Sequence, residues 1–182
     1  QIINFTFPHI GNVGANKEDN ESENVWTKGV VFNSEITEPS NYRSLANLDL
    51  WLKRNKIVGI TGLDTRTLTN FIRDKGAPKG TIAFSKNKNF NIQKLVNTTT
   101  KWSGLKNLDL AKIVSTKNKY IWSGYKTWKK ETGYLKNKKK SLHVVAIDYG
   151  IKKNILRYFS DFNCKVTVVS CQTSADEILK LK

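Results

Sequence analysis

The chain has 182 residues, of which 38% are hydrophobic and 25% charged. This balance is typical of folded globular proteins and argues against wholesale disorder. The apolar runs are too short to cross a bilayer, so we expect no membrane segment. Two cysteines, Cys164 and Cys171, cannot build a disulfide framework, which favours a reducing, cytoplasmic setting. The sequence holds no CxxC motif or His/Cys cluster, so a zinc site is not expected.

The two ends of the sequence suggest a fragment. Gln1 opens the chain, and there is no methionine at any position. Residues 175–182 carry a helical pattern that stops without a capping glycine. We therefore expect the chain to stop in mid-helix and the natural protein to continue beyond both ends.

The net charge of +16, from 31 basic and 15 acidic residues, has two interpretations. It is typical of proteins that bind nucleic acid, and Trp102, Trp122 and Trp128 among the lysines resemble a stacking platform for single strands. Arginine, which suits bidentate phosphate contacts, is however scarce, and the joint excess of Lys and Asn is what an AT-rich genome produces. We therefore expect no nucleic-acid partner and keep a basic nucleic-acid-binding module as the alternative. Residues 136–140 are interpreted as a solvated linker, and the tryptophans as anchors to a core.

The first part of the chain alternates strand and helix signals. Strands are predicted at residues 2–7, 28–32, 57–60 and 79–84. A helix capped by Ser44 is expected to run to about Asn55, and a second is expected from the Asp64 cap to Gly76. Residues 8–16 form a loop in which Gly11 and Gly14 permit positive φ angles.

The rest of the chain changes character near residues 135–141, where we expect a domain boundary. Before it, only helical turns at residues 91–96 and 109–114 are predicted. After it come a strand at 142–147, a helix at 152–162, a strand at 165–169 and a helix capped by Thr173 or Ser174. That β-α-β-α order predicts a parallel sheet covered by helices.

Few residues suggest chemistry. His9 lies in the glycine loop, where positioning and structural roles both stay open, and His143 is expected to be packed within its strand. Cys164 and Cys171 are expected to be inert, because neither has a base cued to it. The residues by themselves indicate an α/β chain without an assembled active site.

Two further groups stand at the ends of predicted elements. Asp64-Thr65-Arg66 begins a helix, where capping or an interface ion pair explains it. Asp148-Tyr149-Gly150 follows a strand, at the carboxyl edge where α/β proteins place functional groups.

An ordered set of segments resembles the small, glutamine-hydrolysing subunit of carbamoyl-phosphate synthetase. The set covers nearly the whole chain and comprises FPHIGNVG (7–14), YRS (42–44), LKRN (52–55), GLDTRTLT (62–69), RDKGA (73–77), DLAK (109–112), VVAIDYG (144–150), NILR (154–157, preceded by Lys153) and CKVTVV (164–169) running into QTSA (172–175). Each segment alone is weak, whereas their common order is specific.

The resemblance implies two domains of the α/β class. Residues 1–138 are similar to a β/β/α swivelling-type N-terminal domain that docks on the large synthetase subunit. Residues 141–182 resemble the first β-α-β-α of a flavodoxin-like class I glutamine amidotransferase domain. The family hydrolyses glutamine and passes ammonia to the large subunit, which makes carbamoyl phosphate for pyrimidines and arginine from bicarbonate, with ATP and Mg²⁺.

The resemblance carries over no catalytic residue, because the family's oxyanion loop, Gly-x-Cys-x-Gly elbow and later His and Glu have no counterpart here. We expect no cofactor on this chain and no glutaminase activity from it alone. Ser170-Cys171 stands where the family usually has Pro-Ala, and Pro78 replaces a usual Gln. The candidates for docking or positioning are His9, Gly11, Asn12, Gly14, Asp64, Thr65 and Arg66, and those of the amidotransferase strand-loop are Asp148, Tyr149 and Gly150.

Overall fold

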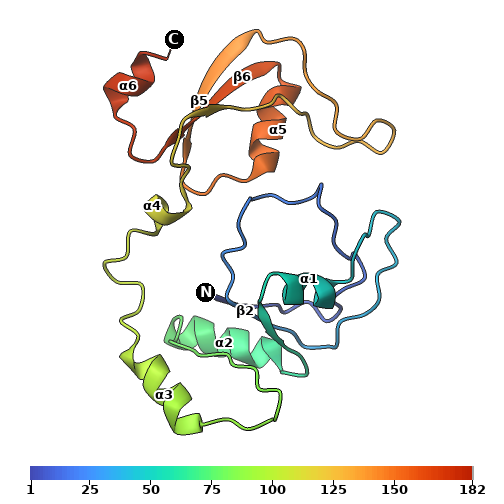
Figure 1. The fold of residues 1–182 in the computed structure, drawn as a ribbon, viewed down its shortest axis with the longest axis vertical. Helices are drawn as coiled ribbons and strands as arrows, with labels where there is room; N and C mark the ends of the chain where they lie inside the picture. Colours follow the sequence, from blue (N-terminus) through green and yellow to red (C-terminus); the bar gives the residue numbers. More distant parts are fainter. Residues whose placement is uncertain (182) are drawn as a thin grey trace. The chain divides into compact units, whose positions relative to one another are not determined.

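A computed structural model describes residues 1–181 (Figure 1). It is a mixed α/β structure, as predicted. The chain divides into two compact units, each described by itself below. The first unit contains Gln1–Asp19 and Asn24–Lys106, and the second contains Asn20–Glu23 and the chain from Asn107 onward.

The first unit contains a parallel sheet in the order β1 (Ile2–Asn4), β2 (Gly29–Val31) and β3 (Val58–Ile60). The three corresponding predictions are confirmed. The hydrophobic core of this unit is formed by four buried side chains, those of Val30, Phe32, Leu52 and Ile57. Burial of apolar side chains of this kind supplies the main stabilising free energy of such a small sheet.

The first unit's helices are α1 (Leu48–Arg54), α2 (Thr65–Lys75) and α3 (Ile92–Lys101). The Asp64 cap and the Gly76 end of α2 are confirmed. The Ser44 cap is wrong, because Asn47 caps α1. The Ser44 hydroxyl instead donates to the Ala46 carbonyl at 3.1 Å, in a segment that a bridge between Ala15 and Ala46 holds extended.

The strand predicted at residues 79–84 is also wrong, since this segment is irregular. A methyl group of Ile82 comes so close to Gly29 that a Cβ there would lie 2.6 Å from it. The segment therefore packs its side chain on β2 and does not extend the sheet by hydrogen bonds.

The second unit contains a sheet in the order β4 (Tyr120–Ile121), β6 (Cys164–Ser170), β5 (Leu142–Asp148). Strands β5 and β6 are parallel, in register from Leu142 with Cys164 to Asp148 with Ser170. Helix α5 (Lys153–Asp161) joins them and lies beside the sheet (Figure 1). Its Leu156 side chain is buried in one cluster with Val166 and Val168 of β6. The predicted β-α-β order is confirmed, whereas the antiparallel pairing of β4 with β6 was not foreseen.

Two short helices complete this unit: α4 (Leu110–Val114) and α6 (Ala175–Leu179). Ser174 caps α6 in a capping box with Glu177, which confirms one of the two predicted caps. The prediction that the chain stops in mid-helix is wrong, because α6 ends at Leu179 with Lys180 as its C-cap. Within residues 1–181, no helix is long and apolar enough to cross a membrane.

Residues 107–138 pack with the C-terminal sheet, although the sequence placed a domain boundary after them. The Trp122 indole donates to the Ser160 hydroxyl at 3.1 Å, and the Asn137 amide donates to the Ser160 carbonyl at 2.7 Å. Asn137 is buried, so interpreting residues 136–140 as a wholly solvated linker is wrong. The compact units thus divide the chain earlier than the predicted domains of residues 1–138 and 141–182, which stay a prediction about the family.

Candidate docking and positioning sites

The glycine loop at residues 8–16 is shaped by its backbone. Gly11 has φ +105° and Gly14 has φ +68°, both in the region that favours glycine. A Cβ on Gly11 would lie 2.5 Å from the Thr37 carbonyl oxygen, and one on Gly14 would lie 2.0 Å from Ser44 Oγ. Both positions therefore require glycine for sterics as well as for φ.

The other two candidates of this loop, Asn12 and His9, both have exposed side chains. Asn12 uses its carbonyl to accept from the Ser40 N–H at 2.9 Å, which fixes the loop, while its side chain is exposed. His9 lies exposed at the start of the loop. The loop thus presents polar side chains on a rigid frame, an arrangement that suits recognition of a partner.

The start of α2 contains one capping, one buried and one exposed side chain. Asp64 accepts from the Thr67 N–H and the Thr67 hydroxyl, both at 2.9 Å. The backbone hydrogen bond from Thr67 is the main reason that the pKa of Asp64 is lowered. Thr65 is 1% exposed, and its carbonyl accepts from the Asn4 amide at 2.8 Å. Arg66 presents an exposed guanidinium, so it is the member of this trio suited to meeting a partner.

The carboxyl end of β5 is organised by Asp148, which is 6% exposed. Its Oδ1 accepts from the N–H groups of Gly150 at 2.8 Å and Ile151 at 2.7 Å, and its Oδ2 accepts from the Thr116 N–H at 2.6 Å. Gly150 has φ +95°, and Tyr149 is exposed. Asp148 therefore ties the turn after β5 to the segment after α4, which is a positioning role.

Ser115 and Thr116 complete this edge and were missed in the sequence. The Ser115 hydroxyl accepts from the Cys171 N–H at 2.9 Å, and Ser115 itself is buried. Both residues follow a short helix in a weakly patterned segment, so no sequence signal marks them. This hydrogen bond engages the backbone of Cys171 and not its thiol.

The remaining cysteine and histidine have no partner that would assemble a nucleophilic site. Cys164 is buried in the core, as an inert thiol would be. His143 is exposed and its Nε2 lies 2.9 Å from Thr167 Oγ1, so the prediction of a packed histidine is wrong. The neighbouring Val144 packs against the core around Leu156, and side chains alternate along a strand, so His143 points to the opposite face of the sheet. Among residues 1–181, no group of three His, Cys, Asp or Glu side chains is placed to hold a metal ion.

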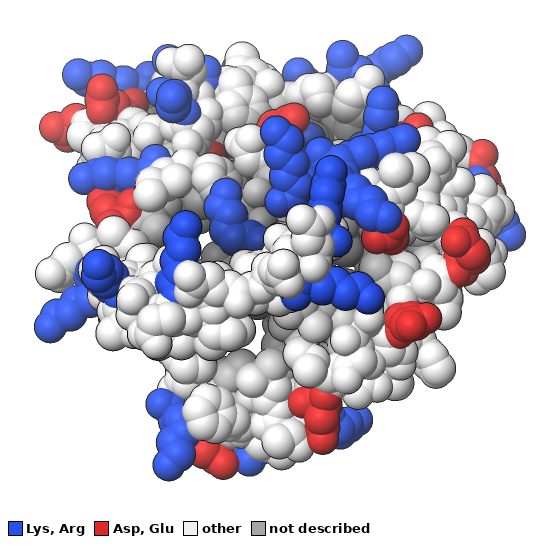
Figure 2. Space-filling view, turned by 60° about the horizontal axis from the view of Figure 1, so that its bottom comes forward, with Lys and Arg blue, Asp and Glu red and all other residues white. Residues whose placement is uncertain are grey.

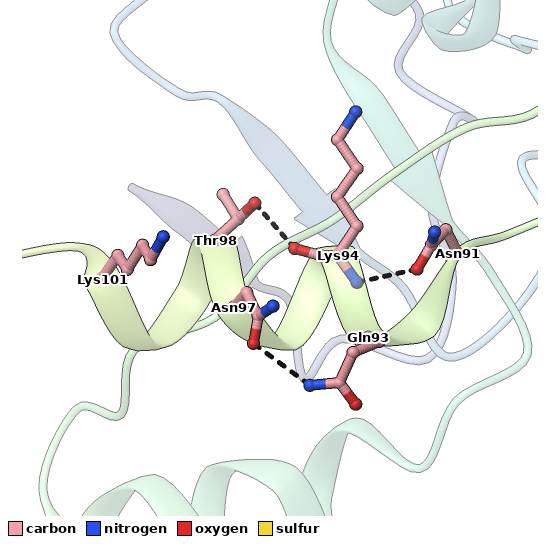
Figure 3. Close-up of a pocket in the computed structure, with 6 residues that line it drawn as sticks. All are labelled: Asn91, Gln93, Lys94, Asn97, Thr98 and Lys101. Carbon is pink, nitrogen blue, oxygen red and sulfur yellow. Dashed lines mark hydrogen bonds between the residues drawn. The ribbon is translucent and has the colours of Figure 1, made fainter.

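A shallow hollow runs along α3 and is lined by polar side chains (Figure 3). The Gln93 amide donates to Asn97 Oδ1 at 3.1 Å, and Asn91 Oδ1 accepts from the Lys94 N–H at 2.8 Å. These side chains thus make hydrogen bonds with one another and with the backbone of the helix. The hollow contains no acid, thiol or imidazole that would make it catalytic.

Basic side chains are spread over the molecular surface, and Figure 2 shows them outnumbering acidic ones on one face. The predicted role of Trp122 as an anchor agrees with its packing against the core of the second unit. A side chain held in this way is not available to stack on a base. The structure therefore gives no support to the stacking platform at this position.

The fold and these sites define an α/β protein with glycine-shaped and carboxylate-held turns, whose described residues contain no assembled catalytic set. Comparison with known proteins shows what the chain is similar to. Residues 1–82 match the family model "Carbamoyl-phosphate synthase small chain, CPSase domain". The chain is homologous over its whole length to carbamoyl phosphate synthase small chains.

Three relatives illustrate this homology, each named carbamoyl phosphate synthase small chain. The chain is 48% identical to the protein of Rhizobium meliloti, 45% to that of Bradyrhizobium diazoefficiens and 46% to that of Zymomonas mobilis. Each alignment includes 100% of this chain and 47%, 47% and 49% of the relative. The chain thus spans about half the length of these curated relatives.

Proposed function

We propose that this chain is part of the small subunit of a glutamine-dependent carbamoyl-phosphate synthase. The whole subunit hydrolyses glutamine and delivers ammonia to a large subunit, which makes carbamoyl phosphate from bicarbonate with ATP. The supporting observation is the 48% identity to a carbamoyl phosphate synthase small chain along the entire chain. Pyrimidine and arginine synthesis are the pathways served, in the cytoplasm.

The proposal includes the finer fold assignment. Residues 1–138 correspond to the swivelling-type domain, and residues 141–182 begin the flavodoxin-like amidotransferase domain. The parallel β5–α5–β6 unit supports the second assignment, because a helical crossover between parallel strands is the repeating element of that architecture.

In this proposal the chain supplies docking and positioning, not bond making. Hydrolysis of an amide by a thiol needs a thiolate, a proton donor for the leaving ammonia and donors for the oxyanion. The contacts of Cys171 and His143 described above supply no such set, so the chain alone has no glutaminase activity. ATP and Mg²⁺ belong to the large subunit, and this chain needs no cofactor of its own.

A graft tests the proposal. Residues 1–182 replace the matching segment of the Rhizobium meliloti small chain, and the product is combined with the large subunit from the same organism. The expected result is glutamine-dependent synthesis of carbamoyl phosphate. A soluble graft that supports synthesis from ammonia but not from glutamine would contradict the proposal.

Arg66 tests the docking part separately in the same graft. Arg66→Ala is expected to weaken association with the large subunit by about tenfold while leaving glutamine cleavage nearly unchanged, because an interface guanidinium contributes on the order of 1–2 kcal/mol. Arg73→Ala is the matched control, since Arg73 is exposed near the other end of α2. Loss of cleavage with association unchanged would overturn the docking role.

A further inference from the structure

Helix α5 begins without a cap from its own sequence. Its N-cap residue, Lys152, makes no side-chain capping hydrogen bond. The first free N–H groups of a helix need acceptors, which a neighbouring Ser, Thr, Asp or Asn usually supplies. Here the acceptor comes from Glu21, which lies 133 residues before Asn154 in the sequence.

Glu21 caps α5 with both its backbone and its side chain. The Glu21 carbonyl accepts from the Lys153 N–H at 3.0 Å, and Glu21 Oε2 accepts from the Asn154 N–H at 2.8 Å. A carboxylate at this position also interacts favourably with the positive end of the helix dipole. The cap is therefore charged as well as hydrogen-bonded.

The second carboxylate oxygen of Glu21 contacts a buried cation. Arg157, which is 5% exposed, donates from Nη1 to Glu21 Oε1 at 3.2 Å. The central carbon of the Arg157 guanidinium lies 4.5 Å from the centre of the Tyr134 ring. A buried guanidinium is costly unless an anion pairs with it, so Arg157 needs the carboxylate that Glu21 supplies.

We infer that the start of α5, together with Arg157, is a carboxylate-binding site whose ligand is the chain's own Glu21. The turn that precedes α5 uses the same chemistry, because Asp148 accepts from the N–H groups of Gly150 and Ile151. Occupation of the site holds residues 20–23 within the second unit and fixes the first turn of α5. This inference concerns contacts within one unit and does not depend on the proposed function.

The experiment measures amide hydrogen exchange in the full chain. Glu21→Ala is expected to speed exchange at Asn154 by about tenfold or more, because this N–H is bonded to the charged carboxylate and such hydrogen bonds are among the stronger ones. The N–H groups of Gly150 and Ile151, held by Asp148, are expected to keep their protection. Glu18→Ala is the matched control, since Glu18 is an exposed carboxylate of the first unit close by in the sequence.

Chemical rescue separates a carboxylate site from general loosening. Sodium acetate added to Glu21→Ala is expected to slow exchange at Asn154, whereas sodium chloride at the same ionic strength is not. Wild-type exchange in Glu21→Ala, or acetate acting no better than chloride, would overturn the inference.

If Glu21→Ala does not fold, Glu21→Gln provides the measurement. The amide keeps an acceptor for Asn154 but loses the negative charge that pairs with Arg157. Exchange at Asn154 is then expected to be several-fold faster than in the wild type. Unchanged exchange together with unchanged stability would show that the carboxylate charge is not required.

Discussion

Replacing Asp148 by alanine tests how the turn after β5 is held. The substitution removes the acceptor of three backbone N–H groups, at 2.6 to 2.8 Å, from a residue that is 6% exposed. A buried donor left without a partner costs about 1–3 kcal/mol, and water reaches part of this turn once the carboxylate is gone. We therefore expect a loss of about 3–5 kcal/mol in the free energy of unfolding of the second unit.

Asp148→Asn refines this expectation. Its amide keeps one oxygen for Gly150 and Ile151, but its NH₂ group faces the N–H of Thr116, so the loss is expected to be about 2 kcal/mol. Urea unfolding followed at amides of β6 measures both variants. Glu131→Ala, at an exposed carboxylate of the same unit, is the control. A loss below about 1 kcal/mol in Asp148→Ala would refute the argument that this carboxylate holds the turn.

Two further predictions concern the first unit. Gly14→Ala is expected to destabilise it by about 3 kcal/mol in urea unfolding, because the strain of φ +68° adds to the clash with Ser44. Gly62→Ala is the control: Gly62 has φ +78° but open space around it, so the expected loss is only about 1 kcal/mol. Equal losses of stability in the two variants would exclude the clash. Because the pKa of Asp64 is lowered in the folded state, its contribution to stability is present above the unfolded pKa of about 4 and is lost as pH falls through the folded value. Asp64→Asn should therefore flatten the acid limb of stability against pH, and an unchanged limb would contradict the assigned cause.

Elements with a local signal were predictable from the sequence. Asp64 and Gly76 bracket α2 with a cap and a stop, and the structure places both as expected. The continuous apolar run in β5 and the helical spacing of α5 likewise specified a parallel unit. In these segments, propensity, periodicity and caps agree, which is the condition for prediction from local sequence.

Features fixed by distant contacts were not predictable. Residues 79–84 alternate like a strand, yet Ile82 packs over Gly29 and the backbone does not join the sheet. Asn137 looks like part of a charged run, but it is buried against α5. The sequence had singled out Asp148 for its place at the end of a strand, while its partner Thr116 and the role of Glu21 depend on chain segments far away. Tertiary structure supplies these acceptors and donors, so no local pattern reports them.

Cys171 provides the last prediction, since a thiol at the end of β6 is the residue that chemistry would first suggest as a nucleophile. The position of His143 argues against it: its Nε2 lies 2.9 Å from Thr167 Oγ1, four residues before Cys171, and a strand rises about 3.3 Å per residue, so this imidazole lies roughly 13 Å from Cys171 along the sheet. A general base must lie within about 3 Å of the proton that it removes. In the graft described above, Cys171→Ser should therefore leave ammonia release from glutamine within about twofold of the parent, because both side chains are small and only the Cys171 N–H is engaged, by Ser115. Release abolished by this substitution in a folded graft would show that Cys171 is a working nucleophile, and that the assignment of docking and positioning to this chain is wrong.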